Sequence, residues 1–222
     1  MAYLDKVALA KYSRAEDWIN SISHMIGVPF TLIATILCLV KAFKLRSWQY
    51  AVLAVVYGIT MLAMYSCSSV YHALRPNKGK KVMRMIDHSM IFPMIAGTIT
   101  PYAILIIVPH NPILGWAVFA VAWVSVIVGI SFTMTMFAKT QWLQLTLYLA
   151  VGWVVIVAFK VLFTYLDRTG FILLLAGGIS YTVGAIVYGI GSKKKYFHSA
   201  FHIFVLIGSI LHFLSLYMYV FI

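Results

Sequence analysis

Long apolar runs dominate the chain and alternate with short polar segments. Seven of them are long enough to cross a bilayer as an α-helix, which takes about 20 mostly apolar residues. They cover residues 22–42, 48–71, 86–108, 112–137, 141–165, 169–190 and 197–222. The runs are continuous rather than alternating in polarity, which excludes a transmembrane β-barrel. The pattern predicts an all-α integral membrane protein, a seven-transmembrane helix bundle over residues 22–222 that follows an N-terminal tail, residues 1–21.

The composition supports the same fold class. Of the 222 residues, 63% are hydrophobic and only 10% are charged. A soluble domain is about half apolar and about a quarter charged, so this chain is neither soluble nor disordered. Residues 1–20 are polar and no small-residue cleavage site follows the first apolar run. We therefore expect the first run to stay in the protein as an anchor rather than act as a signal peptide.

The net charge of +12 gives an orientation. In a soluble protein such an excess would suggest nucleic acid, but membrane proteins gather Lys and Arg on their cytoplasmic side. Twelve of the 17 Lys and Arg residues fall in the N-terminal tail and in the loops after the second, fourth and sixth runs. We therefore expect a cytoplasmic N-terminus, an external C-terminus and no nucleic-acid partner.

Small residues and prolines add packing detail. Pro93, Gly97 and Pro101 in the third run predict a kinked helix. In the sixth run a small residue recurs every fourth position, at Ala176, Ser180 and Gly184, which predicts close approach of a neighbouring helix.

Polar side chains inside the apolar runs are the candidate functional residues, because ionisable groups are expensive in a membrane and usually functional. In the predicted topology nine such residues share one depth near the cytoplasmic face: Glu16, Asn20, His24, Ser68, His72, Asp87, His88, His198 and His202. His110, in a short outer loop, and His212, deeper in the last run, are expected to be structural.

The spacing of the histidines points to a metal. His198 and His202 are four residues apart and lie on one face of a helix. Together with His72 they would give three imidazoles from two helices, and three histidines with one open position form a catalytic zinc site. Asp87 can bind the metal directly or act as a base on a metal-bound water. Ser68, one turn before His72, can orient the same water or a substrate carbonyl.

Four motifs occur in the following order: Glu16-x-x-x-Asn20-x-x-x-His24, Ser68-Ser-Val-Tyr-His72, Asp87-His88-Ser89 and His198-x-x-x-His202. In these motifs the chain resembles the hemolysin III family, the bacterial branch of the progestin and adiponectin receptor (PAQR) proteins. The resemblance covers essentially the whole chain, and it implies seven spans with an inward N-terminus. We therefore expect a multi-pass protein of a bacterial plasma membrane.

The resemblance also implies a chemistry. Zn²⁺ would be held near the cytoplasmic face by His72, His198 and His202, with Asp87 near the zinc-bound water and Ser68 in the same cluster. Relatives with this residue set include alkaline ceramidases, which hydrolyse lipid amides. Bacterial members have been called hemolysins and linked to membrane lipid homeostasis.

Four further residues are accessory candidates. Glu16, Asn20 and His24 form a family motif to which the sequence assigns no chemical role. His88 is about 100° around the helix from Asp87, so the two are not expected to face the same point.

Three functions are compatible with these features. The leading hypothesis is a zinc-dependent hydrolase of a lipid amide or ester, with a sphingolipid or phospholipid substrate whose acyl chain lies between the helices. In it, Asp87 takes a proton and returns it to the leaving amine. The second is a non-catalytic, zinc-stabilised regulator of lipid homeostasis or membrane fluidity. The third is a pore-forming cytolysin, which ranks lowest because the polar residues gather at one face rather than along a path.

Overall fold

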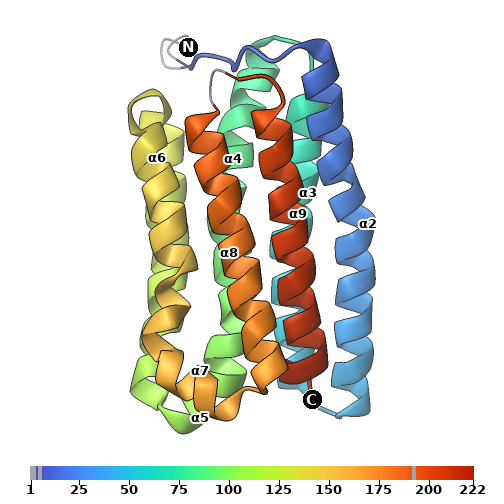
Figure 1. The fold of residues 1–222 in the computed structure, drawn as a ribbon, viewed down its shortest axis with the longest axis vertical. Helices are drawn as coiled ribbons and strands as arrows, with labels where there is room; N and C mark the ends of the chain where they lie inside the picture. Colours follow the sequence, from blue (N-terminus) through green and yellow to red (C-terminus); the bar gives the residue numbers. More distant parts are fainter. Residues whose placement is uncertain (1–3, 5–6, 192–193) are drawn as a thin grey trace.

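The structure is a computed structural model that describes residues 4, 7–191 and 194–222, without the side chains of residues 138, 139 and 141. Lys6 and Lys193 from the charge count lie outside the described residues, as does the side chain of Lys139. The elements of the described part are all helical (Figure 1): α2 (Arg14–Lys44), α3 (Trp48–Ala73), α4 (Lys78–Tyr102), η1 (Ala103–Ile107), α5 (Val108–His110), α6 (Pro112–Gly152), η2 (Val154–Ala158), α7 (Phe159–Tyr165), α8 (Arg168–Ile190), α9 (Phe197–Ser215) and η3 (Leu216–Val220).

Within the described part of the chain, seven helical segments are long and apolar enough to cross a membrane, which confirms the predicted fold class. The third runs from α4 through η1 and α5, and α6 holds the fourth and the start of the fifth. A non-helical residue inside α6, Met136 with φ −132° and ψ 20°, separates these two. The chain termini lie at opposite ends of the bundle (Figure 1).

The first helix begins earlier than its apolar run. Ser13 caps α2 in a capping box, in which its hydroxyl accepts from the Glu16 N–H and its own N–H donates to the Glu16 carboxylate at 2.9 Å. Such a box satisfies N–H groups that the first turn leaves free. The polar start of α2, up to the expected boundary at residue 21, is therefore helical and not an extended tail.

The predicted irregularity of the third span takes the form of a π-helix. α4 contains both Pro93 and Pro101 and continues directly into η1, whose hydrogen bonds span five residues. Proline cannot donate a backbone hydrogen bond, and π-helical turns accommodate such a break in the ladder.

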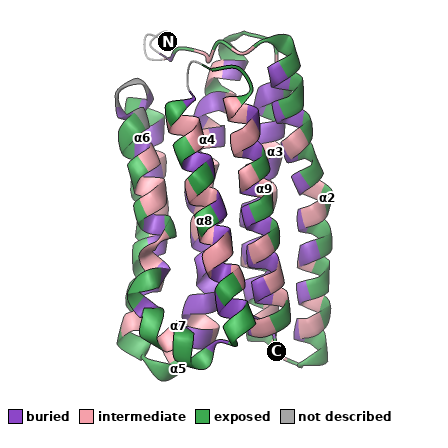
Figure 2. Cartoon of the chain, in the orientation of Figure 1, coloured by how far each residue is buried: buried purple, intermediate pink, exposed green. Residues whose placement is uncertain are grey.

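The small residues of α8 face α9, as the stripe predicts. The Ser180 hydroxyl donates to the Phe204 carbonyl at 2.8 Å, and a Cβ added at Gly184 would lie 2.9 Å from the Phe204 Cβ. α2 packs on α3 and α9, and α4 packs between α3 and α6. Buried residues lie on the inward faces of these helices and exposed residues on the outward faces (Figure 2). Because α6 and α8 contact each other only sparsely, the ring of helices leaves room for a cavity.

Candidate metal centre

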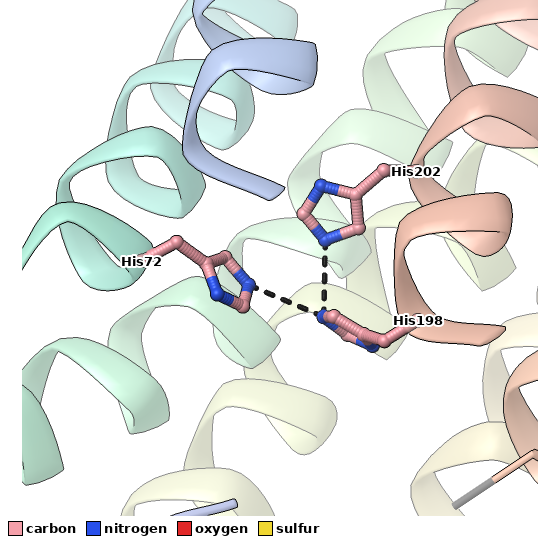
Figure 3. Close-up of side chains that lie close together, drawn as sticks. All are labelled: His72, His198 and His202. Carbon is pink, nitrogen blue, oxygen red and sulfur yellow. Dashed lines mark hydrogen bonds between the residues drawn. The ribbon is translucent and has the colours of Figure 1, made fainter. Parts of the chain in front are cut away.

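Three histidines, His72, His198 and His202, point toward one another (Figure 3). His72 comes from the last turn of α3, and His198 and His202 come from the first turns of α9. The Nε2 atom of His198 lies 3.2 Å from Nε2 of His72 and 3.0 Å from Nε2 of His202. One ring nitrogen from each of the three histidines lies within 4.8 Å of the other two. The structure therefore brings together the three residues that the spacing singled out.

Asp17 orients His72. One carboxylate oxygen of Asp17 lies 3.3 Å from His72 Nδ1, and the other accepts from the Lys80 ammonium at 2.7 Å. All three side chains are buried. Because a carboxylate only accepts hydrogen bonds, His72 carries its proton on Nδ1. Its Nε2 lone pair therefore points toward the other histidines.

Asn20 orients His202 in the same way. The backbone carbonyl of Asn20 lies 3.1 Å from His202 Nδ1, and the Ser23 hydroxyl, which donates to the same carbonyl at 2.9 Å, lies 3.2 Å from that nitrogen. A carbonyl accepts only, so His202 also carries its proton on Nδ1 and directs its Nε2 lone pair inward.

The donor set fits zinc. The Nε2 lone pairs of His72 and His202 both point at His198 Nε2, which carries at most one proton, so hydrogen bonding satisfies only one of them. A Zn–N distance of about 2.0–2.1 Å in a tetrahedral site implies nitrogens about 3.3 Å apart, close to the observed 3.0 and 3.2 Å. A cation at this point would satisfy all three nitrogens, and three protein ligands leave the fourth zinc position open.

The Glu16 and Asn20 positions now have a structural role, because both side chains hold the start of α9. A carboxylate oxygen of Glu16 accepts from the Tyr196 N–H at 2.8 Å, and the Asn20 side-chain oxygen accepts from the Ser199 hydroxyl at 2.6 Å. Tyr196 has φ 63°, in the left-handed region that non-glycine residues rarely adopt. These two contacts therefore fix the helix start that carries His198 and His202.

His24 lies beneath the cluster. Its ring stacks on His202 with centroids 3.6 Å apart, and neither of its ring nitrogens has a hydrogen-bond partner in the described part of the chain. It lines the central cavity but does not belong to the group of three. Its visible contribution is to pack against a ligand.

Asp87, Ser68 and His88 stand beside the cluster and line the same cavity. Asp87 and Ser68 are both buried. The expectation that His88 and Asp87 face apart is wrong: His88 Nδ1 lies 3.6 Å from Asp87 Oδ2. The His88 ring points toward the preceding turn of α4, where its Nδ1–H donates to the Arg84 carbonyl at 2.9 Å.

Sequence reasoning missed Asp17, Lys80 and Tyr12. A signal for Asp17 exists: it is four residues before Ser21, and both side chains face α3, where the Ser21 hydroxyl donates to the Ser69 carbonyl at 2.9 Å. Tyr12 precedes every apolar run and carries no such signal. Its ring stacks on His198 with centroids 4.9 Å apart at 20°. Burial raises the pKa of its phenol far above the usual range, so Tyr12 is neutral where it covers the cluster.

The cavity enclosed by the helices has a volume of about 1100 Å³, its opening included. His198, His202, Asp87 and Ser68 line it at the N-terminal end of the bundle. Most of the remaining lining is apolar and comes from α4, α6, α8 and α9, including Ile91, Met94, Ile95, Ile99, Leu145, Leu149 and Val205. The polar cluster thus lies at one end of a long apolar chamber.

Comparison with known proteins gives the family. Residues 12–213 match the family described as "Haemolysin-III related". The chain belongs to this family. It is 37% identical to Hemolysin-3 of Bacillus cereus over 205 residues, which is 92% of each chain. It is 35% identical to the Hemolysin-3 homolog of Bacillus subtilis (strain 168) over 194 residues, 87% of this chain and 89% of that one. No solved structure matches.

This haemolysin-III-related chain is a multi-pass membrane protein whose histidine cluster lies at its most basic end. α3 ends there, and α4 and α9 begin there, so the basic residues of the connecting loops and of the first turns of α4 lie at this end: Arg75, Lys78, Lys80, Lys81, Arg84, Lys194 and Lys195. The opposite end carries fewer: Lys41, Lys44, Arg46, Lys160 and Arg168. By the charge rule the cluster end is predicted to be cytoplasmic.

Proposed function

We propose that the protein is a zinc-dependent hydrolase of lipid amides or esters, with its centre at the cytoplasmic side of the membrane. One observation carries the proposal: three imidazole nitrogens converge, and two of these histidines, His198 and His202, line an apolar cavity that the buried Asp87 also lines. Such a combination suits a substrate with a polar scissile bond and a long hydrocarbon chain.

The residues divide the chemistry between them. Zinc held by His72, His198 and His202 would lower the pKa of water toward neutrality and polarise the substrate carbonyl. Asp87 accepts the proton of the attacking water while the new C–O bond forms, and it returns that proton to the leaving amine or alcohol as the scissile bond breaks. Ser68 orients the carbonyl, and the apolar cavity holds the acyl chain and excludes bulk water.

The test uses purified, zinc-loaded protein with labelled ceramides and phospholipids. We expect Asp87→Asn to keep its zinc and to lose about 10²- to 10⁴-fold in turnover, the usual contribution of a general acid–base group. Asp167→Asn is the matched control, because Asp167 caps α8 at the other end of the bundle. Protein that holds zinc and turns over no member of the panel would refute the hydrolase.

A regulatory role is the second candidate. The three histidines come from α3 and α9, and α2 orients two of them: Asp17 contacts His72, and the Asn20 carbonyl contacts His202. A bound zinc would therefore link α3 directly to α9, and α2 to both through these contacts. In this case Asp87→Asn would leave the cellular phenotype intact while His202→Ala would prevent folding. A hydrolase predicts instead that Asp87→Asn is inactive in the cellular assay although it folds.

Cytolysis is the third candidate and is favoured by the names of the two Bacillus relatives. A pore needs a polar path across the whole bilayer, whereas most of the cavity lining beyond the cluster is apolar. Conductance of the purified protein in planar bilayers, absent from His72→Ala, would favour this function over hydrolysis.

A further inference from the structure

The central cavity ends at a wall, beyond which lies a second pocket. Four residues line both spaces: Gly152, Trp153, Gly178 and His212. We call this set the partition. The space beyond it, here the distal pocket, is otherwise lined by apolar residues alone: Val155, Ile156, Leu162, Phe171, Leu174 and Leu175. The two spaces are therefore adjacent and share a wall of four residues.

Trp153 is positioned across the wall by a break in the helix. α6 ends at Gly152, and the chain continues as the 3-10 helix η2 after Trp153, which has φ −92° and ψ 1°. The indole N–H donates to the Thr182 hydroxyl on α8 at 2.9 Å. At Gly178 an added Cβ would lie 3.3 Å from the indole ring, so the ring lies against the α8 backbone where a side chain is missing.

His212 forms the α9 side of the wall. Its Nε2–H donates to the Leu174 carbonyl at 3.0 Å, and its ring sits so close to Gly177 that an added Cβ would overlap it. Its Nδ1 has no hydrogen-bond partner in the described part of the chain. Ten residues separate it from His202, which places the wall about 15 Å along the helix axis from the metal centre.

We propose that the partition measures the acyl chain of the ligand: Trp153 and His212 stop chains longer than the central cavity, and the distal pocket becomes available only when Trp153 moves. The inference rests on the proposed function, because it assumes that the polar end of a lipid sits at the histidine cluster. Lipid tails are as apolar as a protein interior, so additional methylenes gain little when a chain leaves the bilayer for the cavity. Selection by length must then come from steric rejection at a wall, and the partition lies across the path.

The experiment measures binding separately from turnover. Purified zinc-loaded protein in detergent is titrated with saturated fatty acids graded two carbons at a time, by displacement of a fluorescent fatty acid. For the wild type we expect affinity to fall sharply above one chain length. Trp153→Ala should move this limit to longer chains, and Gly178→Val, which adds bulk where the indole lies, should not lengthen it.

Trp116→Ala is the matched control, because Trp116 lines neither the central cavity nor the distal pocket and is 53% exposed. An unchanged limit in a Trp153→Ala protein that retains zinc and elutes normally would overturn the proposal, as would a wild type that binds all lengths equally or none. If Trp153→Ala does not fold, Thr182→Ala, which frees the indole, replaces it with the same expected direction. A length limit that shifts in Trp153→Ala without turnover of any lipid would support the partition while refuting the hydrolase.

Discussion

His202 and His212 lie ten residues apart on α9 and both line the central cavity, yet their surroundings give them different chemistry. Each uses one ring nitrogen to donate to a backbone carbonyl, of Asn20 and Leu174 respectively, and keeps the other for the cavity. The free nitrogen of His202 meets two further imidazoles, whereas that of His212 meets no polar partner in the described chain. A free imidazole nitrogen thus becomes a candidate metal ligand only where other helices bring matching donors to it.

The largest expected effect is on zinc binding, and it distinguishes His202 from His212. His202→Ala should abolish zinc binding, because two remaining imidazoles cannot complete a site that already has an open position. His212→Gln should keep zinc near the wild-type level. Metal content of the purified variants by emission spectroscopy decides this. Zinc retained in His202→Ala would show that the three-histidine group is not the metal centre.

The next prediction concerns the Asp17 carboxylate beside His72. His212 has no such partner among the described residues. Asp17→Asn should weaken zinc affinity about 10- to 100-fold, the usual cost of losing a group that orients a metal-bound histidine. Competition with a fluorescent chelator measures the dissociation constant. Asp167→Asn should leave that constant unchanged, and equal constants for both variants would remove Asp17 from the site.

A smaller effect, on the free energy of unfolding, concerns the start of α9 and should leave the distal half of that helix unchanged. Glu16→Ala removes the acceptor for the Tyr196 N–H and the return bond of the capping box. It should lower the free energy of unfolding by about 1–3 kcal/mol. Thermal unfolding in detergent reports the loss, and zinc affinity should fall with it. The length limit set at Trp153 should stay the same, and a change there would mean that the two ends are not independent.

The smallest effect concerns Tyr12, which covers the histidine cluster. Among the described residues, the distal pocket has no such cover. Tyr12→Ala removes a ring stacked on His198, and such contacts contribute about 0.5–1.5 kcal/mol. Zinc release to excess chelator, followed by stopped flow, should speed up about two- to tenfold. Tyr12→Phe keeps the ring and should match the wild type. Equal rates for Tyr12→Ala and wild type would show that this segment does not shield the metal.

Much of the site could be read from the chain because each part has a local signal. The i, i+4 spacing of His198 and His202 places both on one face of α9 whatever the rest of the fold does. Membrane topology then brings His72 to the same depth, since the ends of α3 and α9 are fixed by the lengths of their apolar runs. By contrast, hydropathy underestimated α2, because its first turns are polar and are stabilised by the Ser13–Glu16 capping box rather than by burial.

The sequence by itself determined the seven-helix membrane fold, the family and the identity of the three converging histidines, because these depend on apolar length and on spacing within single helices. Tertiary structure alone decided which second residue orients each ligand, as in the Asp17–His72 and Asn20–His202 pairs. It also decided that Glu16 and Asn20 hold α9, and that Trp153 and His212 divide the apolar interior. The physical reason is that these contacts join residues far apart in the chain, and their partners are set by the rotation and break points of packed helices.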